Sequence, residues 1–153
     1  MKEDSNIADA SALFRVAVSA LIFDDEGRVL LARRRDIDWW NLPNGGMEAG
    51  ETVDEALRRE AMEELGVSIE VGQLVGVYSK PLKQEVVLAF RCRIINGAPA
   101  PTEETRECHY FFPHNLPANT LPKHRQRIED ALLNQEQAVI RAQRTSTAED
   151  QSL

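Results

Sequence analysis

GGMEAGETVDEALRREAMEELGV, residues 45–67, predicts a glycine-rich loop that leads into a short helix. Thr52 followed three residues later by Glu55 has the capping-box spacing of a helix start, and Gly66 is a typical helix stop. A stripe of apolar residues at a spacing of four would dock this helix on a core: Leu57, Ala61 and Leu65. The stretch therefore predicts a loop and a helix that pack on the rest of the domain.

Three carboxylates crowd one face of this helix, because Glu60, Glu63 and Glu64 stand at i, i+3 and i+4. Like charges at these spacings cost about 0.2–0.5 kcal/mol per pair in an isolated helix. A hard divalent cation would offset the repulsion, since Mg²⁺ prefers oxygen ligands. The alternative is a solvated acidic face, which is the usual meaning of glutamate on a helix.

The fixed positions of a known motif are all present in this stretch: Gly45, Glu51, Arg59, Glu60, Glu63, Glu64 and Gly66. Their spacing resembles the Nudix box, G-x5-E-x7-R-E-U-x-E-E-x-G-U, in which U is a bulky aliphatic residue. If each residue type fills roughly one position in fifteen, a chance match at a given register has a probability of about one in 10⁸. Ala61 departs from the box because it is small where relatives usually carry Ile, Leu or Val.

The resemblance implies an α/β (α+β) fold, a three-layer α/β/α sandwich around a mixed β-sheet. Hydrophobic patterns predict strand segments over 14–23, 28–33, 68–79, 85–95 and 107–112, and a last helix over 124–144. The segment 14–23 is apolar on both faces, so we expect it to be central. A chain of 153 residues fits one domain. We place that domain at 14–144, between a flexible N-terminus (1–13) and a disordered tail (145–153).

Composition narrows the class of protein. A hydrophobic content of 42% is that of a soluble globular domain, and a net charge of −7 disfavours a broad nucleic-acid surface. Neither a secretory signal nor an apolar run long enough to span a membrane is evident. Cys92 and Cys108 lack a metal-binding spacing and suggest free thiols. We therefore expect a cytoplasmic protein with no membrane partner and no stable nucleic-acid partner.

The resemblance implies a metal site for Mg²⁺ (or Mn²⁺). It makes Glu60 and Glu64 the first ligands, with Glu63 and a backbone carbonyl at Gly45 or Gly46 next. Hydrolysis of a diphosphate needs such an ion, because water must approach phosphorus through a shell of negative oxygens.

A second pair of box residues, Glu51 and Arg59, has a different implied role. In relatives the arginine pairs with carboxylates and holds the loop over the metal site, which suits its planar fork. The alternative for Arg59 is an ordinary surface ion pair, worth about 0–1 kcal/mol.

In relatives the general base is either a box glutamate or a glutamate of a later loop. Glu103, Glu104 and Glu107 follow a proline-rich connector, and Glu104 and Glu107 are the better candidates. The alternative is simply an acidic loop. The predicted catalytic set is thus Glu51, Arg59, Glu60, Glu63, Glu104 and Glu107.

Candidate substrate-binding residues adjoin the box loop. Trp39 and Trp40 precede it, and we expect one to pack in the core while the other stacks on a base. Arg33 and Arg35 would meet phosphates, unless they are merely solvated. Lys80 is the last candidate, beside a proline at a position resembling a marker of ADP-ribose and nucleotide-sugar pyrophosphatases.

The expected activity is cleavage of a diphosphate bond in a nucleoside diphosphate linked to another moiety, such as ADP-ribose or a nucleotide sugar. One alternative is a house-cleaning nucleoside triphosphate pyrophosphatase, and another is a non-catalytic nucleotide-binding module. Such modules tend to lose box glutamates, and this chain keeps them all. Many relatives dimerise, so a homodimer is possible for this chain too.

Overall fold

The structure is a computed structural model that describes residues 13–146 and Asp150. The predicted flexible N-terminus lies outside the described residues except for Leu13. Most of the predicted disordered tail also lies outside them. Within that tail, Asp150 is described and buried, and its carboxylate forms an ion pair with Lys123.

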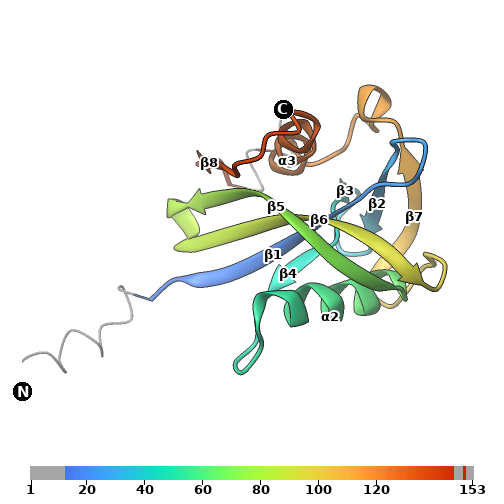
Figure 1. Ribbon diagram of the computed structural model, residues 1–153, viewed down its shortest axis with the longest axis horizontal. Helices are drawn as coiled ribbons and strands as arrows, with labels where there is room; N and C mark the ends of the chain where they lie inside the picture. The colour runs from blue at the N-terminus through green and yellow to red at the C-terminus, as the bar shows by residue number, and fades with distance from the viewer. Residues whose placement is uncertain (1–12, 147–149, 151–153) are drawn as a thin grey trace, which may run out of the picture.

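Most strands belong to one mixed sheet (Figure 1). Its spatial order is β4 (Asn44–Gly46), β1 (Arg15–Ile22), β6 (Glu85–Asn96), β5 (Ser68–Lys80) and β8 (Val139–Ala142). The pairs β1–β6 and β5–β8 are parallel, and the other two pairs are antiparallel. The central position expected of segment 14–23 is confirmed, because β1 has a neighbour on each side.

A smaller sheet adjoins the first one and carries residues that reach the box loop. Its order is β3 (Trp40–Asn41), β2 (Val29–Arg34) and β7 (Thr105–Phe111), and both pairs are antiparallel. Two short 3-10 helices, Pro81–Lys83 and Pro113–Asn115, lie in the connections.

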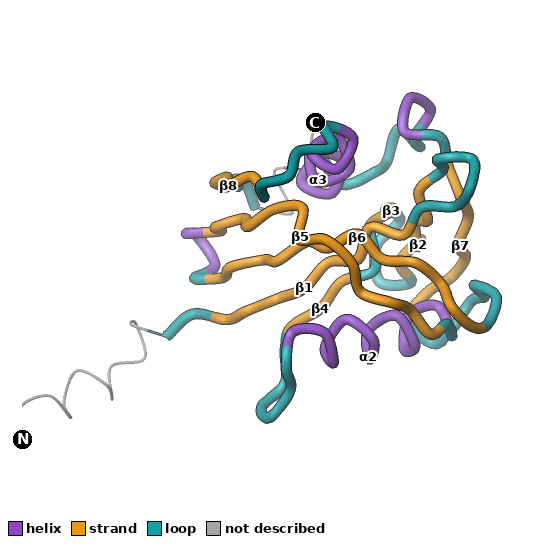
Figure 2. Tube along the Cα trace, in the orientation of Figure 1, coloured by secondary structure: helices purple, strands orange, loops and turns teal. Residues whose placement is uncertain are grey.

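Helices α2 (Val53–Leu65) and α3 (Pro122–Leu132) cover opposite faces of the larger sheet, as Figures 1 and 2 show. Strand β1 explains this, because side chains alternate between the two faces of a strand. One core combines even-numbered β1 residues with α2: Val18, Ala20, Ile22, Ala56, Leu57, Ala61 and Leu65. The other core combines odd-numbered β1 residues with α3: Ala17, Leu21, Ile128 and Ala131. The predicted three-layer α/β/α sandwich is confirmed.

The predicted helix over 124–144 is wrong in its extent. Helix α3 begins at Pro122 and ends at Leu132, and residues 139–142 form β8 instead. Asn134 adopts a left-handed backbone, with φ of 50°, which is a conformation that ends helices. Val139 then pairs with Gly76 at the edge of the sheet. The apolar residues of segment 124–144 have a spacing that also fits a longer helix. Such a spacing carries no information about strand pairing with distant residues.

A buried histidine ties α3 to the segment before the box. The backbone N–H of Leu42 donates to Nδ1 of His124 at 3.0 Å, and His124 is buried. Burial, reinforced by the nearby Arg127, holds the pKa of His124 well below its usual 6.5. The folded protein therefore keeps this imidazole neutral.

We expect His124 to make the fold acid-sensitive. Below about pH 6.5 the unfolded chain binds a proton that the folded chain refuses, so stability present above that pH is lost as pH falls. The loss attributable to His124 is about 1.4 kcal/mol per pH unit. Urea unfolding at pH 7.5, 6.5 and 5.5 measures it. His124→Asn, which retains an acceptor, should flatten the profile over this range, and parallel profiles for the two proteins would contradict the assignment.

Candidate active site

The helix that bears the box glutamates is closed at both ends by its own sequence. Thr52 accepts the N–H of Glu55 at 3.4 Å, as the capping-box spacing predicts. At the other end Gly66 is left-handed, with φ of 71°, and its N–H donates to the carbonyl of Met62. These ends fix which residues of α2 face the loop that precedes it.

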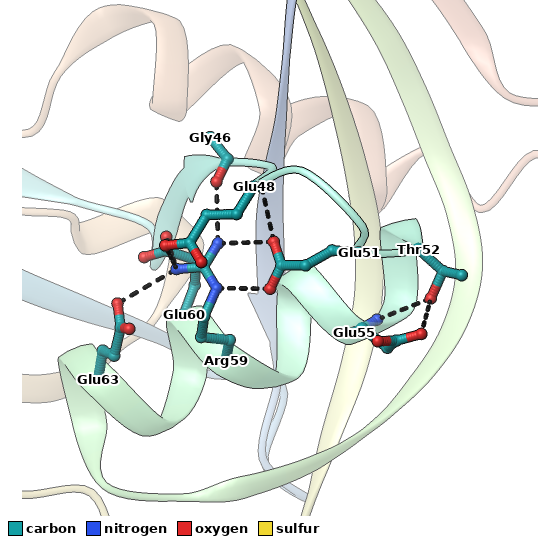
Figure 3. Close-up of polar contacts among 8 residues, drawn as sticks. All are labelled: Gly46, Glu48, Glu51, Thr52, Glu55, Arg59, Glu60 and Glu63. Carbon is teal, nitrogen blue, oxygen red and sulfur yellow. Dashed lines mark hydrogen bonds and ion pairs between the residues drawn. The ribbon is translucent and has the colours of Figure 1, made fainter.

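Arg59 joins that loop to the helix (Figure 3). Its Nε and Nη2 donate to the two carboxylate oxygens of Glu51, at 2.6 and 3.0 Å, and Nη2 also donates to the carbonyl of Gly46 at 2.9 Å. Its Nη1 donates to Glu60 at 2.8 Å and to Glu63 at 3.3 Å. The side chain of Arg59 is only 20% exposed. These contacts support the predicted positioning role of Arg59 and Glu51.

The charges around Arg59 perturb one another. The hydrogen bonds from Arg59 hold the pKa of Glu51 below its usual value, so Glu51 stays ionised as the partner of the arginine. Burial instead raises the pKa of Glu60, and Arg59 opposes that shift. Glu60 is 8% exposed, an unusual place for a carboxylate with one arginine partner.

Three carboxylates meet beside this arginine. One oxygen each of Glu60, Glu63 and Glu104 lies within 4.8 Å of the others. Glu60 and Glu63 come from α2, whereas Glu104 comes from the loop before β7. Hard oxygen donors in a partly open cluster fit Mg²⁺ or Mn²⁺. Such an ion, when bound, neutralises phosphate oxygens and lowers the pKa of the attacking water.

Glu64 has a different environment from the three clustered glutamates. Its Oε2 accepts the backbone N–H of Asn44 at 3.1 Å, so one of its oxygens faces β4. Burial and the neighbouring Glu60 raise the pKa of Glu64 well above its usual value. Its ligand role therefore stays a prediction, and Glu104 joins Glu60 and Glu63 in the cluster of the structure.

Gly45 leaves room for the carboxylate of Glu60. A Cβ at position 45 would lie 2.2 Å from Glu60 Oε1 and 2.3 Å from its Cδ, so no side chain fits without moving Glu60. Glu60 is buried and bonded to Arg59, and the move would disturb both residues. The small residue is needed here for close approach rather than for an unusual φ.

We expect Gly45→Ala to lower kcat/KM about tenfold by displacing Glu60, which is the scale of losing support around a metal site. Gly46→Ala is the matched comparison. A Cβ there would meet the guanidinium of Arg15, 2.3 Å away, but that side chain is 65% exposed and free to swing aside. Steady-state kinetics of both variants test this. An equal loss in the two would contradict the role given to Gly45.

A cavity of about 430 Å³ opens beside the carboxylates. It lies where β2, β4, the end of α2 and the loop before β7 meet. Its polar lining includes Arg34, Arg35, Asn41, Asn44, Glu64 and Glu104. Its volume is within the range of small-molecule sites.

Several predicted substrate-binding residues lie elsewhere. Trp40 is 7% exposed and packs edge-on against Phe111, with ring centroids 5.0 Å apart, so it is a core residue. Trp39 is half-buried, and neither tryptophan is among the described residues that line the cavity. Arg33 is tied to Asp38 and Glu107. Base stacking by Trp39 stays a prediction.

The other basic candidates do line cavities. Arg35 is exposed at the 430 Å³ cavity, where its Nε donates to the carbonyl of Thr102 at 2.9 Å. Lys80 is half-buried, pairs with Glu85 at 3.0 Å and lines a second cavity.

The two candidate bases are now distinguishable. Glu107 pairs with Arg33 at 2.9 Å and with His109 at 3.1 Å, and the bond from Arg33 lowers the pKa of Glu107. It is not among the described residues that line the cavity. Glu104 lines the cavity and belongs to the carboxylate cluster. The geometry favours Glu104.

Thr102, which our reading of the sequence did not single out, fixes the loop that carries Glu104. Its hydroxyl donates to the carbonyl of Glu64 at 3.1 Å and accepts the N–H groups of Glu104 and Thr105 at 3.2 and 3.3 Å. A threonine two residues before a candidate glutamate is a turn signal that could have drawn attention to it. Asn41 and Asn44, which bond each other at 3.2 Å, were also missed as lining residues.

Comparisons with known proteins agree with this geometry. A sequence model of the NUDIX domain matches residues 13–134. A MutT-like protein of Streptomyces ambofaciens is 32% identical over 125 residues, covering 82% of this chain and 81% of that protein. An ADP-ribose pyrophosphatase of Methanocaldococcus jannaschii is 34% identical over 109 residues, covering 67% of this chain and 64% of that protein.

Among solved structures, a NUDIX hydrolase from Nitrosomonas europaea aligns with a TM-score of 0.76 and 25% identity, covering 86% of this chain and 79% of that one. In the described part of this chain, no helix has both the length and the apolar character to cross a membrane. The match to the family extends well beyond the box and covers α2, α3 and every strand of the described residues except β8. The chain belongs to the Nudix family of pyrophosphohydrolases, in which dependence on a divalent metal is typical.

Proposed function

We propose that this enzyme cleaves the diphosphate bond of a nucleoside diphosphate linked to another moiety, such as ADP-ribose or a nucleotide sugar. The products would be a nucleoside monophosphate and a phosphorylated remainder. The observation that carries the proposal is the cluster of Glu60, Glu63 and Glu104, of which Glu104 also lines the 430 Å³ cavity. The name of the archaeal relative, an ADP-ribose pyrophosphatase, supports this substrate class.

The residues divide into three roles in this proposal. Glu60, Glu63 and Glu64 hold the divalent cation. Arg59 and Glu51 are positioning residues, because they fix the loop and the glutamates without facing the cavity. Glu104, from the loop before β7, accepts the proton of the attacking water.

The test is a substrate panel with Mg²⁺ and with Mn²⁺, containing ADP-ribose, UDP-glucose and the deoxynucleoside triphosphates. We expect turnover of the first two, with the monophosphate and the sugar phosphate separated by chromatography, and no turnover in EDTA. Release of diphosphate from the triphosphates alone would support the house-cleaning alternative. Calorimetric binding without turnover would support a non-catalytic module. A cytoplasmic location and a homodimer also stay predictions.

A further inference from the structure

A second cavity, of about 230 Å³, continues from the first. The two cavities share Arg34, Asn41 and Asn44, and the box loop contributes Gly45 and Gly46 to the second. The far wall is built by the adjoining ends of β5 and β6, the start of β1 and the start of α3. A substrate whose diphosphate lies against the carboxylates can therefore extend around the box loop into this space.

The lining of the second cavity is strongly basic. Five cationic side chains contribute to it: Arg15, Arg34, Lys80, Lys83 and Lys123. Two carboxylates, Glu85 and Asp150, belong to the same lining, and Arg34 also pairs with Asp36 outside it, so the cationic side chains outnumber the carboxylates. The whole chain carries a net charge of −7, so this cluster of positive charge is opposite in sign to the net charge of the chain.

The side chains of two of these lysines are largely buried. The side chains of Lys80 and Lys123 are 13% and 8% exposed. A buried ammonium group is costly unless a negative partner accompanies it. Lys80 has Glu85 at 3.0 Å, and Lys123 has Asp150, whose other oxygen accepts the hydroxyl of Thr145 at 2.5 Å. The carboxylate of Asp150 thus occupies a place that suits an anion.

The same lining offers no platform for a nucleobase. Among its described residues the only ring is the imidazole of His124, which is buried and accepts the N–H of Leu42. Bases are usually held by stacking on aromatic faces, whereas phosphates are held by Arg and Lys. The chemistry of the lining therefore matches a phosphate group.

We propose that the second cavity binds a phosphate monoester that the substrate carries in addition to its scissile diphosphate. This proposal rests on the proposed function and narrows its substrate class to phosphorylated nucleoside diphosphate derivatives. Lys80 and Lys123 are the anchoring cations. Asp150 competes with that phosphate for Lys123 and is displaced when the substrate binds.

Matched substrate pairs test this proposal. ADP-ribose and ADP-ribose 2′-phosphate differ by one phosphate monoester, as do dephospho-coenzyme A and coenzyme A. We expect kcat/KM to be about ten- to a hundredfold higher for the phosphorylated member of at least one pair, mainly through KM, since hydrogen bonds between charged groups have that strength. Equal values within both pairs would overturn the proposal while leaving diphosphate hydrolysis established.

Variants of the two lysines and of Asp150 are expected to change the preference for the phosphorylated substrate in opposite directions. Lys80→Met and Lys123→Met should abolish the preference for the added phosphate, whereas Asp150→Asn should increase it several-fold. Arg93→Gln is the control, because it removes an exposed cation that pairs with Glu70, and neither residue is among the described residues that line the cavity. If Lys123→Met fails to fold, the sign of the Asp150→Asn effect still decides, and an unchanged preference there overturns the proposal.

Failure of the proposed function can be distinguished from failure of the phosphate-site proposal. If no pair is hydrolysed, calorimetry of the same pairs in EDTA measures binding without turnover. Tighter binding of the phosphorylated members, lost in Lys80→Met, would then support the basic cavity although the proposed reaction had failed. Equal binding of both members would overturn it.

Discussion

Replacing Glu60 with glutamine is expected to lower kcat/KM for diphosphate hydrolysis about 10²–10³-fold, the scale of removing one preorganised electrostatic group from an active site. Glu60 is the buried member of the three-carboxylate cluster and accepts Nη1 of Arg59 at 2.8 Å. Glutamine has the same shape and keeps an oxygen for that bond, but it lacks the charge that a divalent cation needs. Activity should therefore fall while the protein stays folded.

Kinetics across a Mg²⁺ titration, together with thermal unfolding, check this expectation. The Mg²⁺ concentration for half-maximal activity should rise in Glu60→Gln. Glu70→Gln is the control, because Glu70 is an exposed glutamate of β5 that pairs with the surface cation Arg93. Near-normal activity of Glu60→Gln, with an unchanged Mg²⁺ requirement, would remove the central support for the proposed function.

The box region could be predicted because its determinants are local. Thr52 caps the helix three residues before Glu55, and Gly66 ends it, so both signals lie within one turn of the structure they specify. The pairing of Arg59 with Glu51 spans only eight residues. The family resemblance supplied the layer arrangement, and the alternating apolar residues of β1 supplied its two cores.

The prediction that failed depended on contacts between distant residues. The helix over 124–144 was expected from apolar spacing, yet Val139 pairs with Gly76, 63 residues earlier in the chain. The role of Glu107 as a base stays a prediction, although its pairing with Arg33, 74 residues away, distinguishes it from Glu104. Neither contact has a local sequence signal, because strand pairing and ion pairing join whatever the topology brings together.

The lining of the second cavity also depends on contacts between residues that are distant in the sequence. Lys80 was a substrate-binding candidate from the sequence and Lys123 was not, and only the fold brings the two lysines together in the lining of one cavity beside the box loop. Thr102 likewise gains its importance from the carbonyl of Glu64, 38 residues earlier. Sequence reasoning therefore predicted a candidate reacting centre, whereas the residues that surround it in space required tertiary structure.

Arg59→Lys is expected to lower kcat about 10- to 100-fold, the effect of losing support around a metal site. Lysine keeps the charge but cannot place donors on both Glu51 oxygens and on the carbonyl of Gly46 at once. The same loss should cost about 2 kcal/mol of folding free energy, which corresponds to a fall in Tm of about 4–8 °C.

The neighbouring residue provides a matched control on the same helix. Arg58 pairs with Asp54 at 2.7 Å, but both side chains are about half exposed, and such surface pairs contribute about 0–1 kcal/mol. Arg58→Lys should therefore change Tm by no more than a degree or two and leave kcat at the wild-type level, since the charge is retained and no loop depends on it. If the two variants behave alike, the fork of Arg59 does not hold the loop over the glutamates. If Arg59→Lys loses stability but not kcat, the residue is structural only. A loss of both quantities in Arg59→Lys alone is what the geometry requires.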